Sequence, residues 1–371
     1  MSHPGVLLRR RRMKQVIVLG SGYAGLLAAT WLRRSGHRIT LVSPGGVFVH
    51  RIRLHEVAAG TRPHADRVLR DIVDRRIKVV DGAARLVEPG RVKLASGAEL
   101  YGDAIVLATG SGGAIPRPGT VRIDTAESAR VARREIDALR PGSRVAVVGG
   151  GHTGLEVVTE IGSARPDLDI ALHAAEDVTL GLDPRAGAAV RARLASLGVS
   201  VLDGRVDLAD RASLRADLVI DTTGLVAQPL ARDSGLPVTE DGRVIVDATA
   251  AVRGARGLWA AGDCAAFESK PDLRRSCALS VPMAAHTAAQ VLRSLAGRDP
   301  VPFRFGFAAR CLSLGRAEGL VQFVHADDSP RGVYWSGRAG ATGNEIVNRL
   351  VGVVPFRFAH QYRAPRTLEF T

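Results

Sequence analysis

A repeated arrangement of an apolar strand, a glycine-rich turn and an alanine-rich helix constrains this chain more than any other feature. The first copy occupies residues 16–42 and contains the turn GSGYAG at residues 20–25. The second copy occupies residues 144–173 and contains the turn GGGHTG at residues 149–154. Strand, glycine turn, helix and strand in this order predict a βαβ unit. Two such units in one chain predict two dinucleotide-binding folds.

The three glycines of each turn have separate tasks in such a fold. Gly20 permits the tight turn, Gly22 lets the backbone approach a pyrophosphate, and Gly25 lets the helix pack closely on the strand. The helix that follows presents free N–H groups to phosphate. The corresponding glycines of the second turn are Gly149, Gly151 and Gly154.

The end of the second strand in each unit lacks the acid that usually binds an adenosine ribose. Ser43 stands near that position in the first unit, where its hydroxyl would bind the ribose more weakly than a carboxylate. Ala174 stands there in the second unit, with Glu176 a little beyond. Without the acid, repulsion of a 2′-phosphate is reduced, so NADH and NADPH both remain open.

Three more apolar strands and one long helix complete the pattern. The strands lie at residues 103–110, 217–224 and 257–263, and each ends in a glycine or a Gly-Asp pair. A helix is expected from about residue 281 to 295, followed by a proline-marked break and a C-terminal segment with β-type patterning.

The net charge of +14 does not indicate a nucleic-acid partner. The arginines are scattered, except for a run at residues 9–12 in what we expect to be a disordered basic leader (residues 1–13). Aromatic residues make up only 4% of the chain and no nucleic-acid-binding motif is present, so stacking on bases is disfavoured. Attraction to an anionic membrane surface is the more reasonable use of this charge.

Cysteine content and hydropathy point to the cytoplasm. The chain has Cys264, Cys277 and Cys311, whose spacing suits neither a disulfide framework nor a metal site. No apolar stretch reaches the roughly 18–20 residues that cross a bilayer. We therefore expect a cytoplasmic protein, free or attached peripherally to the inner face of the cell membrane.

Taken in order, the motifs GSGYAG, Ala-Thr-Gly, GGGHTGLE, Thr-Thr-Gly and Ala-Ala-Gly-Asp resemble the pyridine-nucleotide oxidoreductases, a flavoprotein family with two dinucleotide-binding domains. Within that family the chain looks most like the type II NADH dehydrogenase branch, whose flavin-adjacent segment resembles residues 48–60. The resemblance implies an α/β fold with two Rossmann-like, three-layer ββα domains and a small C-terminal α+β segment. It also implies FAD and NAD(P)H as cofactors.

The resemblance further implies how the chain is divided. An FAD domain would consist of residues 14–112 and 227–305, with an NAD(P)H domain at 113–226 inserted between its two parts. Residues 306–371 would form an interface segment.

Several residues acquire roles from the resemblance. Asp263 would contact the ribityl or pyrophosphate region of the flavin, and Pro282 to Ala284 would open a helix whose N–H groups face the flavin's pyrimidine edge. Glu156 would lie near nicotinamide and flavin, and Arg51 would contact flavin or substrate. Further cofactor contacts are expected at Tyr23, Ala24, Thr109, Gly110, Thr153, Gly224, Gly262 and Met283.

Three histidines, His50, His55 and His286, are expected near the flavin, where a structural role is favoured over proton delivery. Cys264 is expected to be a small packed residue.

The implied reaction is hydride transfer from NAD(P)H to flavin N5, with the protein supplying position and electrostatics. No cysteine precedes Cys264, which excludes the redox disulfide and the single-cysteine mechanisms of related enzymes. Quinone is the acceptor in the type II branch, although only Gln290 remains of that branch's glutamine-rich motif. A ferredoxin-like carrier or specialised metabolite, and a slow redox sensor of the apoptosis-inducing-factor type, are the alternatives.

Residues 344–354 predict an amphipathic helix, with Ile346, Val347, Leu350, Val351 and Val354 on one face. This face is expected to pack on the core or on a second copy of the chain. Contact with a membrane surface is the alternative.

Overall fold

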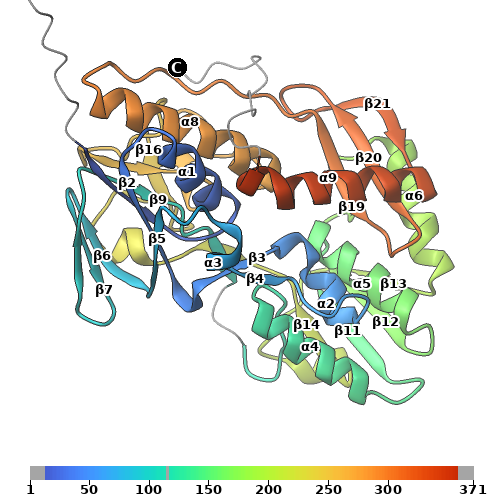
Figure 1. Ribbon diagram of the computed structural model, residues 1–371. Helices are drawn as coiled ribbons and strands as arrows, with labels where there is room; N and C mark the ends of the chain where they lie inside the picture. Colours follow the sequence, from blue (N-terminus) through green and yellow to red (C-terminus); the bar gives the residue numbers. More distant parts are fainter. Residues whose placement is uncertain (1–12, 114–116, 358–371) are drawn as a thin grey trace, which may run out of the picture.

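The structure is a computed structural model that describes residues 13–113 and 117–357 (Figure 1). All but the last residue of the predicted basic leader therefore lies outside the described residues. Two parallel sheets dominate, and each contains one of the two glycine-turn units.

The first sheet has five strands in the order β17-β9-β1-β2-β5, all paired in parallel. Their interior residues are almost continuously apolar and buried, as expected for a parallel sheet covered on both faces. The strands are β1 (Gln15–Leu19), β2 (Arg38–Ser43), β5 (Ile77–Asp81), β9 (Ala104–Leu107) and β17 (Leu258–Ala260).

Helices α1 (Tyr23–Arg33) and α8 (Cys277–Leu295) pack against each other beside this sheet (Figure 1). An antiparallel meander of β6 (Ala84–Glu88), β7 (Arg91–Leu94) and β8 (Glu99–Tyr101) shares the same hydrophobic core. Smaller elements are β3 (Val47–Val49), α2 (Leu54–Ala59), β4 (Asp66–Val68), α3 (Leu69–Ile72), α7 (Leu230–Asp233), β16 (Val244–Val246) and β18 (Ala265–Phe267).

The second sheet has four parallel strands in the order β13-β12-β11-β14. Its elements are α4 (Ala126–Ala138), β11 (Arg144–Val148), α5 (His152–Ala164), β12 (Asp169–Ala174), α6 (Pro184–Ser196), β13 (Ser200–Asp203) and β14 (Leu218–Asp221). The chain enters and leaves this unit through β10 (Ser111–Gly113) and β15 (Leu225–Ala227), which pair in antiparallel fashion. The predicted α/β fold with two Rossmann-like units is confirmed.

The C-terminal part is an antiparallel sheet of β19 (Ala309–Ser313), β20 (Gly319–Val324) and β21 (Pro330–Trp335), along which α9 (Gly337–Arg357) lies (Figure 1). No helix in the described ranges is both long and apolar enough to cross a bilayer.

Only part of the predicted apolar face of α9 is covered: Val347 and Val351 are half-buried. Ile346 and Leu350 are each 54% exposed, whereas Gly340, Asn344 and Asn348 are buried. A Cβ atom on Gly340 would overlap the carbonyl oxygen of Gly319. The helix therefore contacts β20 and α1 partly through small and amide residues, so that Ile346 and Leu350 are left outside.

Candidate functional site

The first glycine turn has the geometry of a phosphate cradle. Gly20 adopts a φ of +105°, and a Cβ atom on Gly25 would overlap the carbonyl oxygen of Gly20. A Cβ on Gly22, in contrast, would meet no atom within 4 Å, and the φ of −68° at Gly22 suits any residue. Gly22 is therefore not required by the chain itself, but it leaves room above the turn. No side chain caps α1, so its first N–H groups face that space.

The second turn repeats this geometry. Gly149 has a φ of +120°, and Gly154 packs on the carbonyl oxygen of Gly149 as Gly25 does on Gly20. A Cβ on Gly151 would meet no atom within 4 Å, and α5 begins without a side-chain cap or an acid in its first turn. Both turns therefore fit a dinucleotide pyrophosphate.

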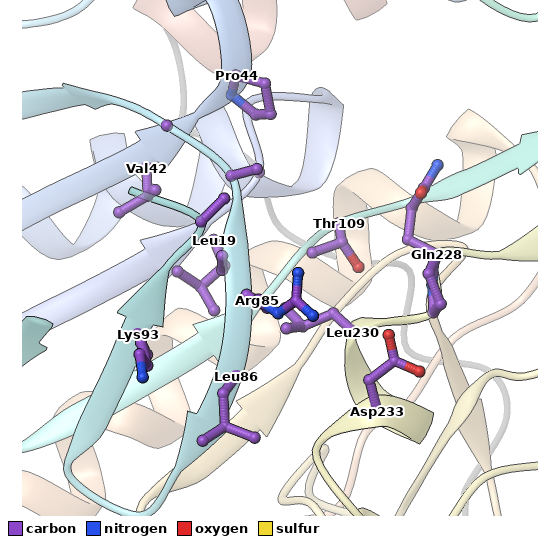
Figure 2. Close-up of a pocket in the computed structure, with 16 residues that line it drawn as sticks. Leu19, Val42, Pro44, Arg85, Leu86, Lys93, Thr109, Gln228, Leu230 and Asp233 are labelled. Carbon is purple, nitrogen blue, oxygen red and sulfur yellow. The ribbon is translucent and has the colours of Figure 1, made fainter. Parts of the chain in front are cut away.

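A cavity of about 820 Å³ opens beside the first turn (Figure 2). Gly20 and Thr109 line it from the ends of β1 and β9, and the β6–β7 meander contributes Arg85 and Lys93. Sequence reasoning identified Thr109 but missed the two cations, because nothing in their spacing connects the meander with the glycine turn. The other polar side chains that line the cavity are Gln228 and Asp233.

Ser43, which was predicted to contact a ribose, does not line this cavity. Its side chain is 4% exposed, and its Oγ lies 2.6 Å from Oγ of Ser21. Val42 and Pro44 line the cavity instead. Successive side chains of a strand point to opposite faces, so Ser43 at the end of β2 turns away from the space that Val42 faces.

A second cavity, of about 220 Å³, lies where the two glycine-turn units meet. It brings together predicted site residues from distant parts of the chain: Tyr23 from α1, Thr153 and Glu156 from α5, and Arg51 and Asp263 from connecting segments. His55, which was expected near the flavin, also lines it. Sequence reasoning missed its other polar residues, which are Ser111, Arg122, Asp124, Asp221, Thr222, Ser276, Cys277 and Ser280.

Hydrogen bonds hold the side chains of this cavity in place. Asp263 accepts from Oγ of Ser111 at 3.1 Å and from Oγ of Ser280 at 3.2 Å. The Arg51 guanidinium donates to the backbone carbonyl of Ser111. Ser111 therefore connects the two predicted residues. Across the cavity, Asp221 is 1% exposed and accepts from Arg122 at 2.6 Å.

The glycines that follow the central strands allow tight turns or close contacts. Gly110, Gly224 and Gly262 all have φ values near +70° to +80°. A Cβ on Gly262 would lie 2.9 Å from the Cβ of Ala24, so Gly262 lets its loop approach α1.

The predicted start of the long helix is wrong. α8 begins at Cys277, with Ser276 as its N-cap accepting from the Leu279 N–H. Pro282 lies inside the helix, and Met283 and Ala284 are buried in the core. Proline at an interior position is unusual, which is why the sequence suggested a later start. The first turn of α8 borders the cavity through Ser276 and Cys277.

Glu156 is half-buried beside other acids, with 21% of its side chain exposed. Loss of solvation, reinforced by the charges of Glu56 and Glu160, raises the pKa of Glu156 to about 8, although an N–H from Ser313 and the charge of Arg316 oppose the shift. Glu156 is therefore largely protonated near neutral pH, unlike an exposed helix carboxylate.

The three histidines have different surroundings. His55 lines the cavity, and burial lowers its pKa to about 3. Tyr23 and His50 are joined by a hydrogen bond of 2.8 Å between the phenol and Nδ1. His286 packs against Phe303, with ring centroids 5.0 Å apart, and does not line the cavity.

The cysteines are all free thiols. Cys264 is buried and its sulfur lies 3.4 Å from the carbonyl oxygen of Ala261, which fits a packed residue. Burial raises the pKa of Cys277 to about 11, so this cavity residue carries a neutral thiol.

Comparisons with known proteins agree with this geometry. Residues 14–291 match the family described as pyridine nucleotide-disulphide oxidoreductase. Ferroptosis suppressor protein 1 of Xenopus tropicalis is 26% identical over 343 residues, which cover 83% of this chain and 88% of that protein. The ferredoxin–NAD(+) reductase component of the biphenyl dioxygenase system of Paraburkholderia xenovorans is 30% identical over 358 residues, covering 85% of each.

Among solved structures, the sulfide:quinone oxidoreductase of Aquifex aeolicus superposes with a TM-score of 0.76 at 16% identity, covering 92% of this chain and 91% of that one. The named activities of these proteins differ. The comparisons therefore support the family but do not single out its type II NADH dehydrogenase branch.

Proposed function

This chain belongs to the pyridine nucleotide-disulphide oxidoreductase family, and from that premise we propose that it passes electrons from NAD(P)H through FAD to a quinone or a similar small acceptor. Membership implies that the chain is an oxidoreductase that binds FAD and NAD(P)H. In this proposal FAD occupies the unit formed by residues 14–112 and 227–305. NAD(P)H occupies residues 113–226, and residues 306–371 form an interface segment.

The observation that carries the proposal is the cavity shared by the two glycine-turn helices. Tyr23 follows the first cradle directly, and Thr153 and Glu156 follow the second, yet all three line one space. Dinucleotides held at the two cradles would extend toward this space from opposite sides. Such convergence brings two cofactors into the contact that hydride transfer requires.

The side chains around the cavity fit this role. FAD would supply the hydride chemistry. Asp263, positioned by Ser111 and Ser280, would bind hydroxyl groups near the flavin, and Arg51 would supply a cation beside them. The N-terminal turn of α8, with its partial positive charge, would stabilise negative charge on the ring system.

The acceptor is inferred from chemistry. A disulfide relay requires a cysteine pair at the flavin, and here the only cavity cysteine is Cys277, a neutral thiol. The cavity also has apolar walls that suit a flat ring, formed by Ile52, Leu54, Ile123 and Leu225. The resemblance to the type II branch favours quinone as that ring.

A ferredoxin-like carrier is the second candidate. It is supported by the 30% identical relative that is named as a ferredoxin reductase component. A protein carrier would not have to enter the active-site cavity as a quinone ring does, and it would accept one electron at a time.

Peripheral attachment to the inner face of the cell membrane is part of the proposal. Ile346 and Leu350 are exposed on α9, and Arg349 lies between them. Apolar residues flanked by cations suit an anionic lipid surface. A second copy of the chain on the same face is the alternative.

Stopped-flow absorption separates these candidates. The yellow protein is mixed with NADH or NADPH, and then with a short-chain quinone or with a ferredoxin. Rapid bleaching followed by quinone-dependent recovery of the flavin band is the expected result. Recovery with ferredoxin alone would favour the second candidate, slow bleaching with a long-wavelength charge-transfer band would favour a redox sensor, and absence of any flavin band would overturn the assignment.

A further inference from the structure

A third cavity, which is strongly polar, lies next to the site. It has a volume of about 480 Å³ and opens between α2, the β19–β20 turn and α9. Charged side chains dominate its lining, chiefly Arg53, Glu56, Arg62, Arg316, Glu345 and Arg349. Because polar side chains surround it, water can fill this cavity.

A thin wall of titratable groups separates this polar cavity from the candidate active site. His55 and Glu156 line the active-site cavity, and the next residue along α2, Glu56, lines the polar cavity. Nδ1 of His55 lies 3.8 Å from the Glu156 carboxylate, and Nε2 of His55 lies 4.0 Å from the Glu56 carboxylate. Ser313 lines the polar cavity, and its N–H donates to Glu156 at 3.1 Å.

The position of His55 is not explained by its hydrogen bonds. The ring is 4% exposed, and its Nε2 is buried without a hydrogen-bond partner among the described residues. The distances on either side are longer than a hydrogen bond but too short to admit a water between the groups. A small side-chain rotation would therefore bring His55 into direct contact with either acid.

The charges on the two sides of His55 differ. Burial would raise the pKa of Glu56, but hydrogen bonds from Arg53 and Arg62 and the charge of Arg316 lower it. Glu56 is thus ionised. Its charge partly offsets the burial that lowers the pKa of His55 to about 3. Arg316 also pairs with Glu160, the remaining acid next to Glu156, at 2.6 Å.

The proposed reaction requires a proton to cross this wall, and the inference rests on that function. Reduction of a quinone follows NAD(P)H + H⁺ + quinone → NAD(P)⁺ + quinol, so one proton must enter the site in each turnover. A one-electron carrier would accept two electrons in two steps, and the hydrogen delivered as hydride by NAD(P)H would then have to leave the site as a proton. Either acceptor therefore needs proton transfer between the site and water.

We propose that Glu56 and His55 form this route, and that protons pass between the polar cavity and Glu156 through the His55 ring. Glu56 takes a proton from water in the polar cavity and gives it to Nε2 of His55. Once Glu156 has given its own proton to the acceptor, the ring releases the new proton from Nδ1 to Glu156, which holds it beside the bound cofactors. His55 is a positioning residue in this scheme because it acts only through Glu156.

The first test is His55→Ala in the flavin-loaded protein, followed by stopped flow in both half-reactions. Hydride transfer needs no protein proton, so bleaching by NADH should stay within about twofold of the wild-type rate. Quinone-dependent recovery of the flavin band should slow by about a hundredfold, the lower end of the range for proton-transfer groups. Added imidazole should restore it, which a purely structural defect would not allow.

Glu56→Gln provides a second variant that keeps His55 in place and should slow the same step. His286→Ala is the matched control, since it removes a histidine that packs on Phe303 outside the cavity. Circular dichroism and thermal melting would show that each variant is folded.

A readout independent of turnover is the infrared carboxyl band of Glu156 after transfer into D₂O. With cofactor in the active-site cavity, the band should shift promptly in the wild type and His286→Ala, and slowly in His55→Ala. Unchanged recovery and prompt exchange in His55→Ala would overturn the route. Failure of NADH and NADPH to bleach the wild-type flavin would instead overturn the proposed function.

Discussion

Gly25 packs directly on the carbonyl oxygen of Gly20, at a separation that leaves no space for a Cβ atom. Gly154 has the same relationship to Gly149 in the second unit. The middle glycine of each turn, in contrast, faces open space. This difference separates the glycines that the fold needs from those that a ligand needs, and it leads to the first two predictions.

Gly22→Val should yield a folded protein without flavin. The new side chain would occupy the space above the first turn, where no protein atom lies within 4 Å of a Cβ. Far-ultraviolet circular dichroism should match that of the wild type, while the flavin absorption band is lost. Gly25→Val is the control, because it should prevent folding of the first unit. Retention of bound FAD in Gly22→Val would contradict the placement of FAD at this turn.

Gly151→Val should weaken the binding of NAD(P)H without affecting the binding of FAD. The open space above the second turn would be filled while the first turn is untouched, so the protein should purify yellow. Bleaching by NAD(P)H should become at least about a hundredfold slower at fixed nucleotide concentration, because the pyrophosphate can no longer approach the α5 N-terminus. Titration with NADH measures the lost affinity. Loss of the flavin in this variant would mean that the two units hold the opposite cofactors.

Glu156 should make stability depend on pH in a defined direction. Its pKa is raised to about 8, so the folded protein binds a proton that the unfolded chain releases at lower pH. The stability contributed by that proton is present below the ordinary pKa of glutamic acid and is lost as the pH rises toward 8. The free energy of unfolding of Glu156→Gln relative to wild type should therefore increase between about pH 5 and pH 8. Urea titrations across this range measure the difference, and a constant difference would show that Glu156 titrates normally.

Local sequence patterns were sufficient to predict the two glycine-turn units. Strand periodicity, three glycines at fixed spacing and an alanine-rich helix are all short-range signals, and the structure places each βαβ element within a few residues of its prediction. The start of α8 was missed because Pro282 resembles a first-turn proline, although five helical residues precede it. Propensity cannot show that tertiary packing tolerates a proline inside a helix.

The parts of the site that sequence could not predict depend on contacts between distant segments. Ser111 joins Arg51 to Asp263, yet nothing in the local sequence distinguishes this serine from others. The burial of Asn344 and Asn348 depends on where α9 meets β20. Helical periodicity identified a face of α9 but could not tell which face the sheet would cover.

A buried ion pair connects α9 to the site. Arg53 is 3% exposed and contacts Glu56 and Glu345, each at 2.6 Å. Arg53→Met should lower the free energy of unfolding by roughly 2 kcal/mol, because it removes the buried cation that joins Glu56 to Glu345. Arg62 and Arg316 still neutralise Glu56 in this variant. Arg349→Met is the matched control: it breaks the exposed pair with the same Glu345 and should cost about 0.5 kcal/mol or less. Equal losses in chemical denaturation would show that Arg53 does not hold α9.

The exposed face of α9 gives a last prediction, on membrane contact. Leu350 is 54% exposed, and transfer of such a side chain into lipid is worth on the order of 2 kcal/mol. Leu350→Glu should therefore weaken cosedimentation with vesicles of phosphatidylglycerol and phosphatidylcholine by about tenfold or more. Leu202→Glu, which adds the same charge on β13, is the control and should reduce binding only slightly. If both variants bind equally, general charge attraction explains the association. If neither variant binds the vesicles, and Leu350→Glu alone changes the mass of the protein found by analytical ultracentrifugation, a second copy of the chain covers this face.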